Sequence, residues 1–175
     1  MAFHFSQIFW GLLFVFLDFS INGFDLLADG VGYVIVAVGC RCLSPLSTTF
    51  TTARSLCFVL GALWLIGIAF HGDLAILLGL ITTVLDCAMI WHLLGGIRQI
   101  AMSRQRHDLA DRASNRRVAY VAIMIAASLF TFVMRGSSAA GPLALILVVG
   151  MLFLIAMILH LILRVRVELE TQRVI

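Results

Sequence analysis

Six apolar runs follow one another along the chain, with short polar stretches between them. Each run is continuous, whereas a membrane-spanning β-barrel would alternate apolar and polar residues. A helix needs about 20 mostly apolar residues to cross the hydrocarbon of a bilayer, and it satisfies its own backbone there. The runs therefore predict transmembrane helices at about residues 3–20, 24–42, 53–70, 74–97, 118–134 and 142–163.

The composition agrees with a membrane protein. The 175 residues are 62% hydrophobic and 12% charged, whereas soluble domains have about 45–50% apolar and about 25% charged residues. We therefore predict an all-α fold, a polytopic transmembrane helical bundle of six hydrophobic segments forming one domain over residues 1–175. Residues 3–20 are short and lack a charged anchor, so five spans remain if this segment re-enters the membrane or lies in the interface.

The positive charges predict the orientation. All 12 positive residues are arginines. All except Arg135 fall in residues 41–54, 98–117 and 164–175. Positively charged loops face the cytoplasm, so both termini are expected there. The exclusive use of arginine is typical of a GC-rich bacterial genome, and we expect a multi-pass protein of the bacterial cytoplasmic (inner) membrane.

Residues 98–117, RQIAMSRQRHDLADRASNRR, contain no glycine or proline. They predict a basic cytoplasmic helical loop that continues the fourth segment. Asp108 and Arg112 have the i, i+4 spacing of a supporting pair, and Ser114 or Asn115 could cap the fifth segment. A short cytoplasmic tail is expected at about 164–175.

The basic loop has two interpretations. It rests on anionic lipid at the cytoplasmic face, where each arginine contributes about 1 kcal/mol, or it is an arm that grips a partner. The loop has no interleaved aromatic residues for base stacking, so nucleic acid is not an expected partner. The candidate headgroup contacts are Arg98, Arg104, Arg106, Arg112, Arg116 and Arg117.

Asp86 is the acidic residue deepest in an apolar segment, and ionisable residues at such depth are candidates for function. Thr82 and Thr83 precede it by four and three residues, which places the three side chains on one helix face. The carboxyl could relay protons or cations. It could instead be neutral, as low dielectric favours, and bonded to a threonine or to a carbonyl of a neighbouring helix.

The stretch DFSINGFDLLADG, residues 18–30, predicts a turn on the outer side between the first two segments. Asp18 would end one helix, and Asn22 or Asp25 would cap the next. Asp25 would also lie in the first turn of that helix, where the dipole favours negative charge. Asp29 is about one turn deeper, and it alone of these residues could belong to a functional site at the mouth of the bundle.

Two histidines, His92 and His160, are expected at similar depth on two helices. Neutral imidazoles could bind haem or a chlorophyll-type pigment. The alternative is an interfacial polar residue beside Trp91. No other cofactor and no metal site is expected, and the four cysteines are read as free thiols packed as small apolar side chains.

Residues 17–54 contain Asn22-Gly23 and then Asp25-Leu26-Leu27, with Asp29 and Gly32-Tyr33 following. This block resembles an N-terminal block of small bacterial multi-span membrane proteins, close to "I-N…G…DLLPDFIGY". Ala28 replaces the usual proline, and Gly30-Val31 replaces an aromatic pair. The resemblance covers about a fifth of the chain. It implies a bacterial polytopic membrane protein and transfers no catalytic residue, because no function is assigned to that family.

Three functions compete. The chain lacks H-E-x-x-H, G-x-S-x-G and Walker motifs, so an enzyme is not expected. Small residues on the predicted helices favour a non-catalytic membrane subunit that packs in a homo-oligomer or a larger complex. The alternatives are a small ion- or proton-linked transporter or channel using Asp86 with Thr82 and Thr83, and pigment or haem binding by His92 and His160.

Overall fold

The protein is all-helical apart from one very short ribbon, as the sequence predicts. In the computed structural model the helices are α1 Ala2–Phe16, α2 Ala28–Leu43, α3 Thr48–Ala69, α4 Asp73–Ser103, α5 His107–Val133 and α6 Ala140–Thr171. A 3-10 turn (η1) covers Ser44–Leu46, and the strands are β1 Ser20–Ile21 and β2 Phe24–Asp25. The structure describes residues 2–16, 20–21, 24–25, 28–69, 73–133 and 140–171.

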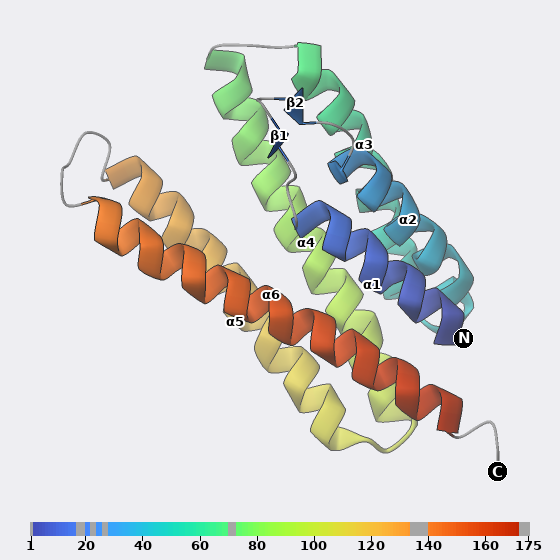
Figure 1. Ribbon diagram of the computed structural model, residues 1–175. Coiled ribbons are helices and arrows are strands. Elements are labelled where there is room, and N and C mark those ends of the chain that lie inside the picture. Colours follow the sequence, from blue (N-terminus) through green and yellow to red (C-terminus); the bar gives the residue numbers. More distant parts are fainter. Residues whose placement is uncertain are drawn as a thin grey trace.

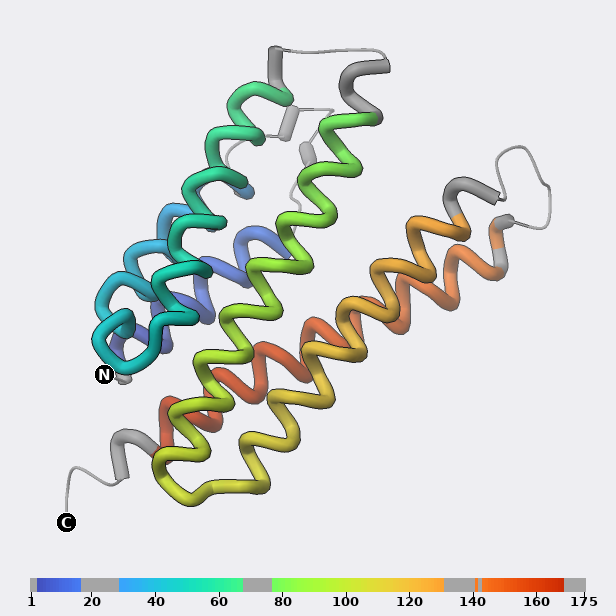
Figure 2. Tube along the Cα trace, turned by 180° about the vertical axis from the view of Figure 1, so that it is seen from behind, coloured from blue at the N-terminus to red at the C-terminus, as the bar shows by residue number. Residues whose placement is uncertain are grey.

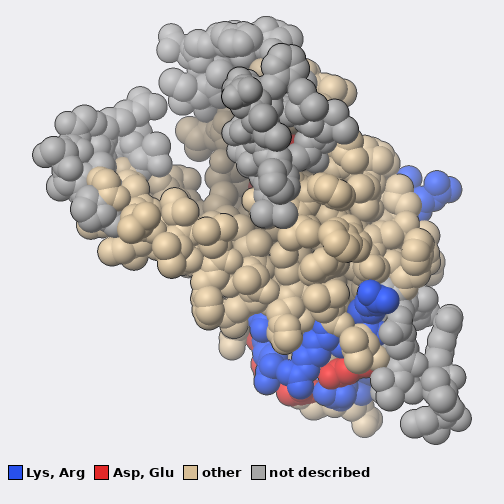
Figure 3. All heavy atoms as spheres, in the orientation of Figure 1, with Lys and Arg blue, Asp and Glu red and all other residues tan. Residues whose placement is uncertain are grey.

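Consecutive helices pack side by side, and α6 returns to contact α1 (Figure 1). The start of α1, the α4–α5 turn and the end of α6 lie at one end of the bundle. Arginine side chains gather over this end in the space-filling view (Figure 3), and we call it the arginine-rich end. The β1–β2 ribbon lies toward the opposite end. This grouping of the charges is the arrangement that the arginine positions predict.

Glycines let α1 and α2 approach closely. A Cβ atom on Gly11 would lie 2.8 Å from the Gly32 carbonyl oxygen, and one on Gly32 would lie 2.8 Å from the Gly11 oxygen. About two turns after Gly32 on α2, a Cβ atom on Gly39 would lie 2.6 Å from the side chain of Ile8. Such separations exclude any side chain, so these glycines fix the interface in the way small residues do in membrane bundles.

The core is concentrated toward the arginine-rich end. Among the described side chains, the buried residues of α4 begin at Met89, those of α6 begin at Leu154, and those of α5 end at Tyr120. The two views of the backbone show the reason, because the α5–α6 hairpin diverges from α4 toward the opposite end (Figures 1 and 2). We call the halves of the helices beyond this core the outer halves.

Among the described residues, four helices are long and apolar enough to cross a membrane, and the predicted number of six spans is not confirmed. Among the described residues, the candidate spans are Asp29–Leu46, Thr48–Gly67, Leu77–Ser103 and Leu143–Glu168. Helix α1 has 15 residues, which gives about 22 Å of helix against a hydrocarbon core of about 30 Å. Helix α5 has 27 residues, but arginines and aspartates occupy its first half.

The prediction of a continuous helix over residues 98–117 is wrong. Helix α4 ends at Ser103, and Gln105 takes a left-handed conformation with φ of 57°. The Arg106 amide donates to the Ala101 carbonyl (2.9 Å), and the Gln105 amide donates to the Met102 carbonyl (3.0 Å). These two bonds form a Schellman motif, which usually has glycine at the left-handed position. Because residues 98–117 contain no glycine, the sequence lacks the usual signal for this helix end.

Two smaller predictions concern the ends of α5 and α6. Helix α5 begins at His107, so Ser114 and Asn115 lie inside it and do not cap it. Residues 164–171 belong to the last turns of α6 and do not form a separate tail.

Candidate functional site

The deep carboxylate has one well-defined partner. The hydroxyl of Tyr33 on α2 donates a 2.8 Å hydrogen bond to Oδ1 of Asp86 on α4. Tyr33 is buried, and Asp86 is half-buried within the candidate span Leu77–Ser103. This satisfies part of the hydrogen-bonding capacity of a carboxyl group that would be costly to bury alone.

Further polar groups surround this pair. Asp29, in the first turn of α2, and Tyr120 of α5 are near enough to interact electrostatically with Tyr33 or Asp86. Asp29 also makes an interaction of its own. Polar groups from three helices therefore converge at one place in the bundle. Sequence reasoning singled out Asp29 and Asp86 but missed both tyrosines, whose apolar rings suit an apolar run.

The two threonines do not bond to Asp86. The hydroxyl of Thr83 donates to the Gly79 carbonyl (2.8 Å), and that of Thr82 contacts the carbonyls of Leu78 (3.1 Å) and Gly79 (2.9 Å). All these bonds stay within α4, as threonine hydroxyls often do inside helices. The partner of Asp86 is on a neighbouring helix, but it is a tyrosine hydroxyl rather than a threonine or a carbonyl.

Within the acidic stretch, strands β1 and β2 pair antiparallel, with Ser20 opposite Asp25 and Ile21 opposite Phe24. Asp25 therefore precedes α2, and the prediction that it lies in the first turn of that helix is wrong; Asp29 occupies the first turn instead. Asp18 and Asn22 lie outside the described residues. The helix begins at Ala28, where the related block has proline, too late for Asp25 to cap it.

The two histidines lie on different helices, α4 and α6, which share α5 as a packing partner. His92 is half-buried on α4, which packs against α3 and α5, and His160 is exposed on α6, which packs against α1 and α5. No hydrogen bond joins the two imidazoles in the described part of the chain. Within the same residues, no group of three or more His, Cys, Asp or Glu side chains could hold a metal ion.

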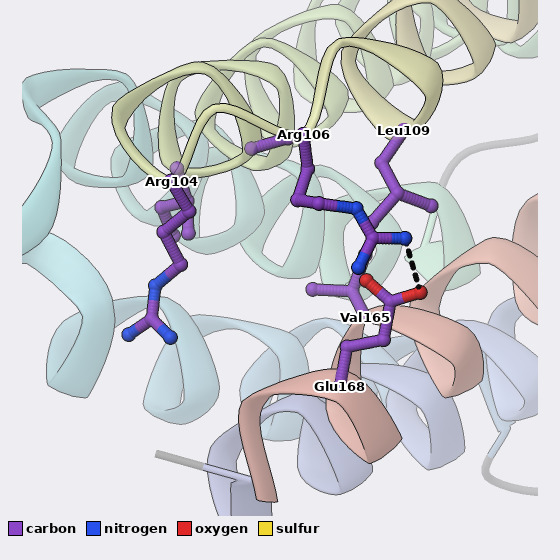
Figure 4. A pocket seen from close by; sticks show the side chains of 7 residues that line it. Arg104, Arg106, Leu109, Val165 and Glu168 are labelled. Atoms are coloured by element: carbon purple, nitrogen blue, oxygen red, sulfur yellow. Dashed lines mark hydrogen bonds and ion pairs between the residues drawn. The ribbon is translucent and has the colours of Figure 1, made fainter. Parts of the chain in front are cut away.

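Ion pairs join α5 to α6 at the arginine-rich end. Arg106 contacts Asp108 (3.2 Å) and Glu168 (3.0 Å), and Arg164 contacts Glu168 (3.7 Å). Figure 4 shows Arg106 pointing toward Glu168 and Arg104 pointing away from that pair. The hydrogen bond from Arg106 lowers the pKa of Asp108 and raises that of Arg106. Asp108 thus bonds to Arg106, rather than to the Arg112 that its spacing suggests.

The six candidate headgroup residues differ in their surroundings. Arg98, Arg104 and Arg112 are exposed, whereas Arg116 is buried. The guanidinium of Arg117 lies 4.3 Å from the centre of the Trp91 ring, which is a cation–π contact between α5 and α4. The sequence gives no signal for this contact, because the two residues are far apart in the chain.

Comparisons with known protein families, with curated proteins and with solved structures give no match for this chain. The resemblance of residues 17–54 to a bacterial membrane-protein block therefore stays a prediction.

Proposed function

We propose that the protein is a non-catalytic integral membrane subunit that packs through its outer halves against a second copy of itself or against a larger membrane complex. The observation that carries this proposal is that the buried residues of α4, α5 and α6 lie toward the arginine-rich end in the described part of the chain. Large apolar side chains are left exposed on the outer halves of three helices, namely Leu80 and Val84 of α4, Ile125 and Leu129 of α5, and Ile146 and Phe153 of α6.

The glycines support this proposal. A Cβ atom on Gly79 or Gly150 would meet nothing within 4 Å among the described residues, whereas one on Gly11 or Gly32 would collide with the neighbouring helix. Helices associate in lipid by close packing at small residues, because lipid is as apolar as leucine. A helix of another protein could therefore approach Gly79 and Gly150 closely, whereas no described residue of this chain does so.

An apolar groove of about 480 Å³ lies between the outer halves of α2 and α3. The ring of Trp64 covers Gly30, and Val34 and Phe58 line the same groove. Its lining is almost wholly apolar, which suits an apolar helix or an acyl chain more than a polar substrate.

We also propose that the arginine-rich end faces the cytoplasm of a bacterial inner membrane, with both termini on that side. The positive-inside rule supports this orientation. In this arrangement α1 and the apolar half of α5 complete six membrane-embedded segments beside the four long spans. Packing against α2 and α6 supports the short α1.

The glycine positions provide a matched experiment. Full-length chains carrying Gly79→Leu, Gly150→Leu or Gly11→Leu are purified in mild detergent, and native mass and melting temperature are measured. Wild type is expected as a multiple of 19.2 kDa or with other membrane proteins bound. Gly79→Leu or Gly150→Leu should lower the mass and keep the fold, whereas Gly11→Leu should destabilise the fold by about 1–3 kcal/mol. A stable wild-type monomer without any partner would contradict the proposal.

A second candidate function is ion- or proton-linked transport at Asp86, favoured by the Tyr33–Asp86 bond and the nearby Asp29. Hydroxyl and carboxyl groups on different helices of a bundle are the usual components of proton pathways in membranes. Flux into liposomes tests it: Asp86→Asn should abolish transport, and Thr83→Val should leave it intact. Absence of flux in wild type, or equal flux in Asp86→Asn, would reject this function.

Haem or pigment binding by His92 and His160 is the weakest candidate, because His160 is exposed on α6 whereas His92 is half-buried on α4. An absorption spectrum of the protein purified from its own membrane tests it. A colourless protein would reject it.

A further inference from the structure

A charged side chain occupies the buried face of α5. Leu109, Ala113, Arg116 and Tyr120 follow one another at helical spacing on this face, and Arg116 is only 7% exposed. Its Nη1 atom is enclosed and has no hydrogen-bond partner among the described residues. An enclosed guanidinium nitrogen without a hydrogen-bond partner is costly, so this arrangement needs an explanation.

The surroundings of Arg116 increase the cost. Burial lowers its pKa, and the neighbouring charges of Arg112 and Arg164 lower it further. The nearby carboxylates Asp108 and Glu168 are engaged by Arg106 and Arg164. Because arginine stays protonated in proteins, Arg116 cannot escape by losing its charge. The three arginines therefore bring three positive charges close together, and among the described ion pairs only Arg164 has a carboxylate contact, 3.7 Å from Glu168.

We propose that Arg112, Arg116 and Arg164 form a binding site for an anionic phosphate group at the interface of α5 and α6. Guanidinium groups bind phosphate through paired, charge-assisted hydrogen bonds, and three of them can contact different oxygens of one phosphate. Arg112 and Arg116 are one turn apart on α5, and Arg164 approaches from α6. A bound phosphate would thus join the two helices of the hairpin.

The depth of the site favours a lipid phosphate. Arg116 and Arg117 immediately precede Val118, where the apolar half of α5 begins. If that half is embedded in the bilayer, Arg116 lies at the level of the headgroups, where anionic phospholipids present their phosphates. A free phosphate has the same chemistry, and the experiment separates the two sources. The site does not depend on the proposed subunit function.

The site makes a prediction about the sign of a stability change. Without phosphate, Arg116→Met should melt at or above the temperature of wild type, because a flexible apolar side chain replaces an uncompensated buried charge. With phosphate bound, wild type should be the more stable of the two.

The experiment uses the full chain, stripped of lipid by detergent exchange. Phosphatidylglycerol, phosphatidylcholine or inorganic phosphate is then added, and native mass spectrometry counts bound molecules while the melting temperature is followed. Phosphatidylglycerol should bind wild type and raise its melting temperature, and phosphatidylcholine should not. Binding to Arg116→Met should be about tenfold weaker, as expected for the loss of a charge-assisted hydrogen bond. Inorganic phosphate acting alone would assign the same site to a free anion.

Two further variants keep the test decisive. Arg164→Gln weakens the site from the other helix, where the side chain is 41% exposed and a fold defect is not expected. Arg98→Gln removes an exposed arginine at the same end of the bundle and should bind like wild type. Equal stabilisation of wild type, Arg116→Met and Arg164→Gln by phosphatidylglycerol, or no stabilisation of wild type by any of the three additions, would overturn the proposal.

Discussion

Tyr33 on α2 and Asp86 on α4 are joined by a 2.8 Å hydrogen bond, although α3 separates their helices in the packing order. The bond fixes the distance between two helices that otherwise meet through their common neighbour. It also gives the deep carboxyl group a structural partner without requiring a transported ion.

Tyr33→Phe removes the donor and leaves the aromatic ring in place. We expect the free energy of unfolding to fall by about 1–2 kcal/mol, the usual contribution of such a bond in a membrane bundle. Asp86→Asn should cost less, because the amide oxygen can still accept the hydrogen bond. The measurement is denaturant unfolding in mixed micelles. Thr83→Val is the control, since its hydroxyl bonds only within α4; a Tyr33→Phe chain as stable as that control would contradict the role of the bond.

The Arg106–Asp108 contact predicts an acid-sensitive junction between α4 and α5. The hydrogen bond from Arg106 lowers the pKa of Asp108 in the folded protein. The stabilisation is therefore present above the ordinary aspartate value of about 3.9, and it is lost as the pH falls through the lower folded value. Asp108→Asn should remove this part of the pH dependence, measured as melting temperature against pH.

Arg98→Gln is the matched control for that measurement, because Arg98 is exposed at the same end and forms no ion pair with Asp108 among the described residues. It should keep the wild-type profile. An Asp108→Asn profile that also matches wild type would show that the contact contributes nothing to folding.

Gln105 occupies the left-handed position of the turn that ends α4. Gln105→Gly should stabilise the protein by about 1 kcal/mol, because glycine adopts this conformation without a steric cost. Gln105→Val should destabilise it, since a β-branched side chain is strained there. Equal unfolding free energies for the two variants would contradict the assigned turn.

The contact between Arg117 and Trp91 should also be measurable. Trp91→Leu removes the ring face and should cost about 0.5–2 kcal/mol, whereas Trp91→Phe should retain part of the interaction. Trp10→Leu is the control, because Trp10 is 52% exposed on α1 and lies over no arginine in the described chain. A loss of stability as large in the Trp10 variant would mean that apolar area, not the cation, accounts for the effect.

Continuous apolar runs were enough to predict the helices, and the arginine positions were enough to predict the clustering of arginines at one end. The number of long spans was not predictable in this way, because α1 and α5 are apolar over too few residues and tertiary packing supports them. The end of α4 near Gln105 was not predicted, because this turn has glutamine at the left-handed position where glycine is usual.

The site was predictable only in part. Asp86 and Asp29 are conspicuous as acids near apolar runs, but the face shared with Thr82 and Thr83 suggested a partner within one helix. The actual partner, Tyr33, depends on how α2 and α4 are placed around α3. Burial of Arg116 is likewise a property of the α5–α6 interface, so all six arginines of residues 98–117 looked equivalent in the sequence.

The central claim is that the outer halves contact another protein inside the membrane, and photo-crosslinking in intact membranes tests it most directly. A photoreactive amino acid is placed at Leu80, Ile125 or Ile146, one on each outer half, with Phe3 of α1 as a control that is 68% exposed. The account predicts protein adducts from the outer-half positions, with a mass equal to two copies of the chain or to the chain plus a larger subunit. Adducts with lipid alone at all three positions would contradict it.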